Sequence, residues 1–250
     1  MKIIDTLAVI PARLGSTRLP EKPLVRLCGR ELVLRVLDGV RACASVDRTI
    51  VATDSERVVS LVEAAGGEAM MTPADLPTGS DRVAWVAERV PSTYVLNVQG
   101  DDPLVVAAHI DPMIEALKKD PETGLAVLAK KIDDPDEISR DSIVKMVFAQ
   151  DGRALYFSRA PIPHPRSGEA AYYKHIGPYA WRRDALFAFA AMPQTPLERM
   201  EGLEMLRLLE NGGTIRCVET ETDCIEIDTP DDVRRFEEFF SKTLSARERV

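Results

Sequence analysis

The sequence predicts an α/β protein with a central, mostly parallel sheet and helices on both of its faces. Through the first half of the chain, apolar strand-like runs alternate with helix-like runs, which is the pattern of parallel βαβ units. Polar or charged residues directly follow several of these strands, at the edge where parallel sheets bind ligands. The chain has 250 residues, 45% hydrophobic and 29% charged, so one large core is expected.

The elements of the first half follow in a regular order. The expected strands span 6–12, 48–54 and 93–99, with a short extended run at 68–71. The expected helices span 31–44, 56–65 and 81–90. Gly66 and Gly67 end the second helix, because glycine is favoured just past a helix C-terminus.

The second half is less regular and predicts antiparallel pairs, because few helices separate its strands. The expected strands span 124–132, 142–149, 154–159 and 174–182. One helix begins near Leu197, and its apolar stripe consists of Met200, Leu203, Leu206 and Leu209. The wheel places Glu204 between apolar residues, so we expect this carboxylate to be buried and paired.

The most informative segment is the loop after the first strand, within residues 7–24, which read LAVIPARLGSTRLPEKPL. Gly15 and Ser16 allow close backbone approach and offer N–H donors, while Arg13 and Lys22 supply positive charge. This composition favours a phosphate-binding loop, although an ordinary surface turn with solvated basic residues is the alternative. It is not a Walker loop, because its lysine does not directly follow a glycine and precede Ser or Thr.

Two aspartates from distant segments suit a magnesium ion. Asp101 follows a strand and a glycine, and Asp228 precedes Thr229 and Pro230, which read as the N-cap and first residue of a final helix. Mg²⁺ prefers one or two carboxylates together with substrate phosphates and water. Local turn or capping roles are the alternative for each aspartate.

Composition excludes several classes of protein. The net charge of −8 argues against a nucleic-acid partner, whose phosphates usually require an excess of positive charge. No apolar run is long enough to span a membrane, and the N-terminus lacks a cleavage site for a signal peptide. We therefore expect no membrane partner and a cytoplasmic location.

Eight motifs together give the chain a specific resemblance. In order, they are IPARLGSTRLPEKPL, ATD, TGSDR, NVQGDDP, ALYFSRAPIP, KHIGPYAW, PLERMEGLEMLRLLENG and IDTPDD. Their order and spacing resemble those of the 3-deoxy-manno-octulosonate cytidylyltransferases, also called CMP-Kdo synthetases, over nearly the whole chain. This resemblance implies transfer of CMP from CTP to an acidic eight-carbon sugar, with release of pyrophosphate, for lipopolysaccharide biosynthesis.

The resemblance also implies a Rossmann-like nucleotide-diphospho-sugar transferase fold in a single domain, 1–250. A CTP-binding part covers about 1–130, a smaller antiparallel subregion for sugar binding and dimerisation covers about 140–215, and a C-terminal helix covers 228–250. A homodimer is expected on the same grounds.

Site residues carry over from the family motif by motif. Catalysis is assigned to Lys22, Asp101 and Asp228, with both aspartates as ligands of Mg²⁺. Contacts to CTP are assigned to Arg13, Gly15, Ser16, Lys22, Met71, Thr78, Gly79, Arg82 and Gln99. Contacts to the sugar are assigned to Arg159, His175, Tyr179, Glu204 and Met205. Read without the family, Arg82 is a helix-surface charge, and His175 and Tyr179 are packed core residues.

The chain departs from the family pattern at three positions. Glu21 replaces a glycine and places an anion in the phosphate loop, and Pro178 removes an N–H from its strand. Met205 replaces a glutamine, and a thioether cannot make the hydrogen bonds of an amide. An 8-amino analogue of Kdo therefore remains an alternative substrate. A sugar-1-phosphate nucleotidyltransferase and a catalytically silent nucleotide-binding regulator are the alternative functions.

Overall fold

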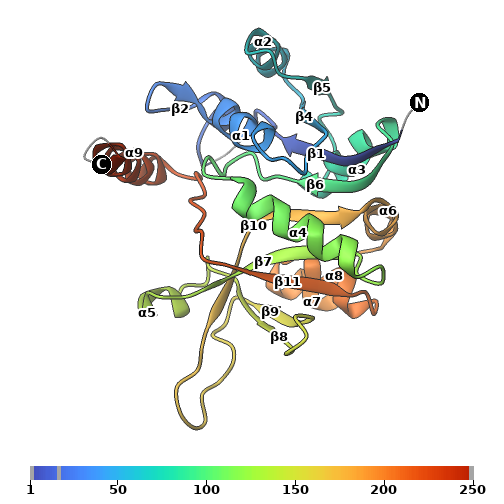
Figure 1. Cartoon of the computed structure of the whole chain (residues 1–250), viewed down its shortest axis with the longest axis vertical. Helices are drawn as coiled ribbons and strands as arrows, with labels where there is room; N and C mark the ends of the chain where they lie inside the picture. The colour runs from blue at the N-terminus through green and yellow to red at the C-terminus, as the bar shows by residue number, and fades with distance from the viewer. Residues whose placement is uncertain (1–2, 16–17, 248–250) are drawn as a thin grey trace.

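The computed structural model describes residues 3–15 and 18–247, and it has one large sheet at its centre (Figure 1). The strands of this sheet are β1 (Ile4–Pro11), β4 (Arg48–Thr53), β5 (Ala69–Met71), β6 (Ser92–Asn97), β7 (Leu125–Lys131), β8 (Lys145–Phe148), β9 (Ala154–Ser158), β10 (Tyr173–Arg182) and β11 (Ile215–Thr220). A small separate sheet pairs β2 (Arg26–Leu27) with β3 (Arg30–Glu31).

The helices are α1 (Leu32–Arg41), α2 (Glu56–Ala64), α3 (Gly79–Arg89), α4 (Ala107–Lys119), α5 (Pro135–Ile138), α6 (Arg183–Ala191), α7 (Pro196–Glu201), α8 (Met205–Glu210) and α9 (Pro230–Arg247). A short 3₁₀ helix, η1 (Lys22–Leu24), follows the basic loop. The predicted elements of the first half are all present within a few residues of their expected bounds.

The main sheet runs in the order β11-β7-β10-β6-β1-β4-β5, and the β8–β9 hairpin joins it through β8 and β10. Strands β4, β1 and β6 are parallel, as are β7 and β11. Only β10 in the central path runs against its neighbours, β6 and β7. The prediction of a mostly parallel sheet with an antiparallel subregion is confirmed.

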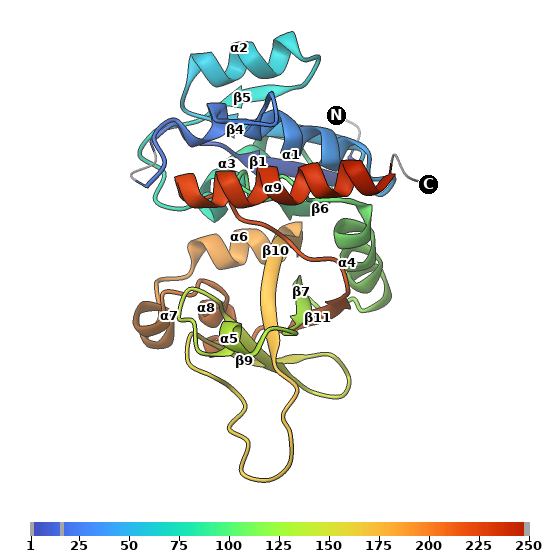
Figure 2. The ribbon, with the colours of Figure 1, turned by 90° about the vertical axis from the view of Figure 1, so that its left-hand side faces the viewer.

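Alternate residues of β1 pack into the two halves of the core, as expected for side chains that point to opposite faces of a strand. Ala8 and Ile10 belong to the cluster that includes buried residues of α1, α2, α4 and α9. Leu7 and Val9 belong to the cluster that includes those of α3, α6 and α8. Figure 2 shows α4 on one side of the sheet and α6 and α8 on the other. A nearly continuous apolar run in β1 is therefore required by burial on both faces.

The prediction of one helix from Leu197 is wrong, because the chain forms two short helices, α7 and α8. Gly202 ends α7 with a left-handed backbone, φ 66°, a conformation that glycine adopts without a Cβ clash. Met200, which we expected on the apolar stripe, is 82% exposed. A buried ion pair between Glu198 and Arg207 joins the two helices instead.

Strand β10 is irregular where Pro178 was expected to disturb it. Its register against β7 shifts between Ile176 and Tyr179, and Gly177 has a positive φ of 66°. A bulge of this kind re-aims the side chains that follow it. The middle of the segment between β9 and β10 extends away from the rest of the molecule (Figures 1 and 2).

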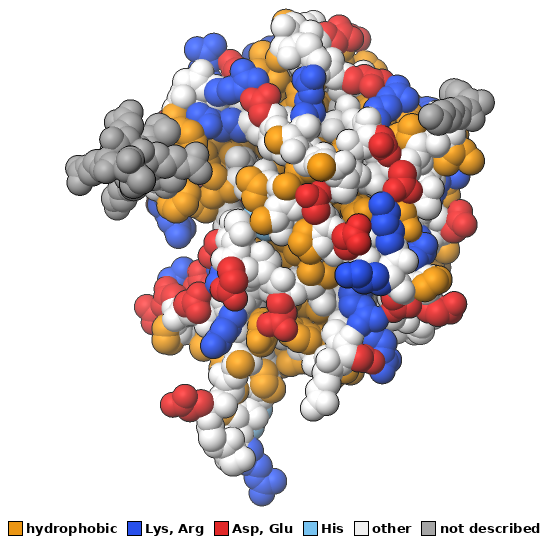
Figure 3. Space-filling model, viewed as in Figure 1, with side chains coloured by type: hydrophobic (Ala, Val, Ile, Leu, Met, Phe, Trp, Pro, Cys, Tyr) orange, Lys and Arg blue, Asp and Glu red, His pale blue; other side chains and the backbone are white. Residues whose placement is uncertain are grey.

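Charges of both signs are mixed on the face drawn in Figure 3. Within residues 3–15 and 18–247, no helix combines the length and the apolar character needed to cross a membrane.

Candidate active site

Three loops meet at the carboxyl edge of the sheet, and Lys22 lies between them. Its Nζ atom is 2.6 Å from Asp101 Oδ2 and 2.9 Å from Asp228 Oδ1. Asp101 follows β6 and Asp228 lies between β11 and α9, so one ammonium group joins loops far apart in the chain, with Lys22 and Asp228 separated by 206 positions. The Ile227 backbone N–H also donates to the Asp101 carbonyl at 2.9 Å, which joins the two carboxylate-bearing loops directly.

The electrostatics of this cluster favour a charged lysine. Burial opposes the ammonium, but the coulombic attraction of Asp101 and the hydrogen bonds to both carboxylates raise the pKa of Lys22 above its ordinary value. Arg18 adds a second cation, with Nη2 at 2.9 Å from Asp228 Oδ2. Two carboxylates and two cations are therefore concentrated at one point on the sheet edge.

A cavity of about 300 Å³ opens beside Lys22, and we call it the lysine cavity. The residues that line it are Pro11, Ala12, Arg13, Arg18, Lys22, Pro23, Leu76, Pro77, Thr78, Gly79, Arg82, Gln99, Gly100, Asp101 and Asp228. Most of the residues that the sequence assigned to CTP and catalysis are thus together. Gly15 and Met71 are not among them, and Ser16 lies outside the described residues.

Arg82 is buried, which excludes the alternative of a solvated helix charge. It is 2% exposed, and its Nη1 donates to Thr72 Oγ1. Burial lowers the pKa of Arg82, although Asp54 opposes the shift. Thr72 in turn donates to the Thr53 carbonyl at 3.0 Å, so the guanidinium is fixed to the ends of β4 and β5.

Thr78 is the N-cap residue of α3. Its Oγ1 accepts a hydrogen bond from the Asp81 backbone N–H at 3.1 Å, and Asp81 accepts one from the Thr78 backbone N–H. This capping box fixes the start of the helix. It places Gly79, the first helical residue, against the cavity, where the free N–H groups of a helix start favour an anion or a carbonyl oxygen.

A second cavity of about 210 Å³ adjoins the first, and we call it the glutamate cavity. It is lined by Gly79, Ser80, Asn97, Gln99, Tyr179, Gly202, Leu203, Glu204 and Met205. Gly79 and Gln99 line both cavities, so the two cavities share part of their walls. Tyr179, Glu204 and Met205 of the predicted sugar site are present here.

Glu204 is paired, as we expected, and its partner was not predicted. Ser80 Oγ donates to Glu204 Oε2 at 2.6 Å. Asn97 lies beside Ser80 at 1% exposure, and its Oδ1 has no hydrogen-bond partner among the described residues. A buried polar group without a partner is uncommon. An asparagine inside an apolar strand was the signal that could have identified Asn97.

His175 and Tyr179 lie on the same strand and their rings are in contact, with centroids 5.1 Å apart. Burial lowers the pKa of His175 to about 4, so the ring is neutral at physiological pH. Burial and the nearby Glu204 raise the pKa of Tyr179, so its hydroxyl stays protonated. His175 does not line either cavity and lies behind Tyr179, against Phe157.

Glu21 occupies a position whose backbone conformation explains the glycine of the family pattern. Its φ is 53° and its ψ is 34°, the left-handed region that glycine favours. The carboxylate pairs with Arg57 of α2 and does not line the lysine cavity. The sequence suggested that the Glu21 carboxylate faces the phosphate site. In the structure this carboxylate lies outside the lysine cavity and its charge is paired with that of Arg57.

We therefore expect Glu21→Gly to retain activity and to raise the midpoint of thermal unfolding by about 2 °C, because it removes the left-handed strain. Calorimetry measures the midpoint. Arg57→Ala is the matched control, since it breaks the same ion pair but leaves the strained backbone in place. A rise in the midpoint with Arg57→Ala, and none with Glu21→Gly, would contradict this explanation.

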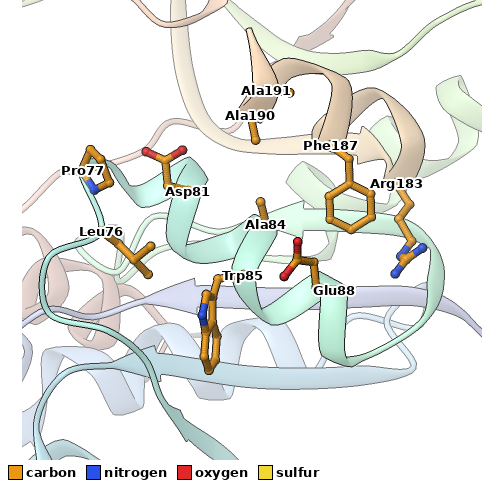
Figure 4. A pocket seen from close by; sticks show the side chains of 10 residues that line it. All are labelled: Leu76, Pro77, Asp81, Ala84, Trp85, Glu88, Arg183, Phe187, Ala190 and Ala191. Atoms are coloured by element: carbon orange, nitrogen blue, oxygen red, sulfur yellow. The ribbon is translucent and has the colours of Figure 1, made fainter. Parts of the chain in front are cut away.

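A further hollow of about 610 Å³ lies elsewhere on the surface. Figure 4 shows its lining side chains, which come from α3, α6 and the turn before α3. Two of its charged groups have other partners, since Asp81 caps α3 and the Arg183 guanidinium lies over the Phe187 ring. Because it holds no convergent group of donors or carboxylates, we do not assign it to the chemistry.

The donor set beside Lys22 fits a divalent cation. Asp101 and Asp228 approach one point from two loops, and both supply the oxygen ligands that Mg²⁺ prefers. Among the residues that the structure describes, no group of three or more His, Cys, Asp or Glu side chains forms a metal site. Two carboxylates leave coordination positions for substrate phosphates and water.

An open α/β sheet with a basic loop and paired carboxylates at its carboxyl edge suits the chemistry of a nucleotidyltransferase. Comparison with known proteins specifies the family. Residues 7–220 match the family model "Cytidylyltransferase". The 3-deoxy-manno-octulosonate cytidylyltransferase of Syntrophotalea carbinolica is 43% identical over 240 residues, which cover 92% of this chain and 96% of that protein. The chain belongs to the 3-deoxy-manno-octulosonate cytidylyltransferase family.

Other relatives agree. The protein of the same name from Chlorobaculum parvum is 43% identical and covers 97% of this chain and 100% of its own length. A solved structure of CMP:2-keto-3-deoxy-manno-octonic acid synthetase complexed with CTP superposes with a TM-score of 0.92 at 36% identity, covering 96% of this chain and 99% of that one. A 4-diphosphocytidyl-2C-methyl-D-erythritol synthase from Anaerococcus prevotii, 16% identical with a TM-score of 0.67 over 95% of this chain and 96% of that one, shares the fold.

Proposed function

We propose that this enzyme transfers CMP from CTP to 3-deoxy-D-manno-octulosonate, releases pyrophosphate and so supplies CMP-Kdo for lipopolysaccharide biosynthesis. The observation that carries the proposal is the junction of the two cavities at Gly79 and Gln99, next to the Asp101, Asp228 and Lys22 cluster. A nucleotide in the lysine cavity and a sugar in the glutamate cavity would meet at this junction. The names of the relatives and the CTP complex support the same substrates.

In this proposal the lysine cavity holds CTP. Arg13 and Lys22 bind the triphosphate, with Gly15 and Ser16 of the same loop, and Gly79 presents the N-terminus of α3. Thr78, Arg82, Gln99 and the backbone near Met71 contact the nucleoside. The fixed position of the Arg82 guanidinium favours a planar partner, because its donors are already oriented.

Asp101 and Asp228 would hold Mg²⁺ in the loaded enzyme. The ion would neutralise phosphate charge and lower the pKa of the attacking hydroxyl. Lys22 lies where it can contact both carboxylates or the phosphates, because its Nζ offers three donors on a flexible stem.

The sugar would occupy the glutamate cavity. Tyr179 and Glu204 offer a donor and an acceptor for hydroxyls, His175 supports the Tyr179 ring, and Arg159 pairs with the carboxylate. The anomeric oxygen attacks the α-phosphorus and loses its proton, and the bond from the α-phosphorus to the pyrophosphate oxygen breaks. No protein nucleophile is needed, so catalysis rests on alignment and charge stabilisation.

The presence of Met205 in the glutamate cavity favours a second candidate substrate. Its side chain lines the glutamate cavity and is 3% exposed, where the family pattern has a glutamine. Loss of an amide at this position changes which polar group of a sugar can be bound. An 8-amino analogue of Kdo is therefore the second candidate.

A pyrophosphate-release assay with CTP and Mg²⁺ tests the function, using Kdo, its 8-amino analogue and sialic acid as acceptors. We expect release with Kdo and little with sialic acid. A greater kcat/KM with the amino analogue than with Kdo would identify the analogue as the substrate. Binding of CTP without release from any acceptor would favour the silent regulator and contradict the proposal.

We also propose a homodimer in the cytoplasm. An interface on the antiparallel subregion would cover two exposed apolar side chains, Leu155 of β9 at 59% and Met200 of α7 at 82%.

A further inference from the structure

The Arg159 guanidinium is held on two sides by main-chain carbonyls. Its Nε donates to the Glu201 carbonyl at 2.7 Å, and its Nη1 donates to the Asp141 carbonyl at 2.8 Å. The remaining nitrogen, Nη2, lies near Gly202, since a Cβ built there would be 3.9 Å from it. Gly202 lines the glutamate cavity, and Arg159 itself does not. The guanidinium is therefore fixed behind Gly202, next to the cavity wall.

Glu201 also restrains the backbone from which the Arg159 side chain extends. Besides its carbonyl, its Oε2 accepts a hydrogen bond from the Arg159 backbone N–H at 2.9 Å, and its Oε1 accepts one from Ser158 Oγ at 2.7 Å. Ser158 ends β9 and Glu201 ends α7. One carboxylate thus joins the end of β9 to the end of α7, next to the backbone of Arg159.

The opposite side of the guanidinium is supported by a buried lysine. Lys145 is 0% exposed, and its Nζ donates to the carbonyls of Arg140 and Ile143, both at 2.7 Å. These carbonyls flank Asp141, whose own carbonyl binds Arg159. Burial lowers the pKa of Lys145. The free-energy cost of burying this ammonium is tolerated where the group fixes a turn.

We propose that Glu201 is a positioning residue that orients Arg159 toward the carboxylate of the acceptor sugar, with Lys145 fixing the turn on the other side. The inference rests on the proposed function, in which Arg159 binds that carboxylate. Bidentate pairing depends on the direction of the guanidinium plane. A misplacement of about 1 Å in a positioning group can cost about 100-fold in rate.

Kinetics of Glu201→Ala test the inference. We expect the KM for the sugar to rise about tenfold or more while the KM for CTP stays within about twofold, because only the Arg159 side of the site is released. Glu201→Gln should restore the sugar KM to within about threefold of the wild type, since an amide oxygen can accept from the Arg159 N–H and its NH₂ can donate to Ser158.

Glu210→Ala is the matched control. Glu210 Oε2 accepts from the Leu197 backbone N–H at 3.1 Å, so this change removes a carboxylate from the same helical pair without touching Arg159. We expect its sugar KM to stay within about twofold of the wild type. Equal effects of Glu201→Ala and Glu210→Ala, or equal effects on the two substrates, would overturn the inference.

A second readout separates orientation from general stability. The wild type should prefer the acidic sugar to its primary amide, and both Glu201→Ala and Lys145→Met should reduce this preference about tenfold. An unchanged preference overturns the inference. If Arg159→Ala leaves the sugar KM unchanged, or the wild type has no turnover with Kdo, the inference and the underlying assignment fail together. An effect of Arg159→Ala without one of Glu201→Ala overturns the inference alone.

Discussion

Replacing Asp101 with asparagine is expected to lower kcat by about 100-fold to 1,000-fold while CTP still binds, because one group of a preorganised charge cluster is removed. The carboxylate lies at the junction of the three loops, 2.6 Å from Lys22. Asparagine keeps the shape of the side chain but halves the number of carboxylates available to a divalent cation. Pyrophosphate release measures turnover, and calorimetry measures the binding of CTP.

Asp231→Asn is the control for this change. Asp231 begins α9 close to Asp228 in the chain, but it pairs with Arg234 and its side chain is 71% exposed. We expect turnover of this variant to match the wild type. Undiminished turnover of Asp101→Asn in Mg²⁺ would show that Asp101 is not a metal ligand.

Replacing Lys22 with methionine is expected to lower kcat/KM for CTP by about 100-fold or more, because the phosphates lose a partly buried cation. The same change is expected to strengthen the binding of Mg²⁺. Without the ammonium, Asp101 loses its ion pair and Asp228 keeps only Arg18, so the affinity of the two carboxylates for Mg²⁺ should rise. Titration with Mg²⁺ in the absence of CTP measures this affinity.

Lys118→Met controls for the loss of a lysine ion pair. Lys118 pairs with Asp5 at 2.9 Å on the surface, with side chains 40% and 49% exposed, and such pairs contribute little. We expect kinetics like those of the wild type. If Lys22→Met also binds Mg²⁺ as the wild type does, the ammonium does not compete with the cation.

The basic loop follows β1 and Asp101 follows β6, as the sequence predicted, and the ends of parallel strands lie at one edge of the sheet. Asp228 lies instead in the irregular segment between β11 and α9. Glu204 was predicted to be paired because the residues around it are apolar. Its partner, Ser80, lies 124 positions away, and no local pattern indicates a contact at that separation.

Other features depend on tertiary contacts or on backbone conformation. The apolar spacing from Leu197 predicted one helix, because residues on both sides of Gly202 face the same core. Periodicity does not reveal that Gly202 adopts a left-handed conformation and ends α7. The family resemblance drew attention to Glu21, but only the positive φ explains why glycine is usual there.

The order of the strands determines when the protein becomes complete during its synthesis. Strand β6 pairs on one side with β1 but on the other with β10, so its second edge stays open until residues 173–182 have left the ribosome. Asp228 emerges later still, and only then can Ile227 bind the Asp101 carbonyl. A nascent chain can thus form the phosphate loop early, yet it cannot assemble the pair of carboxylates until residue 228 has been made.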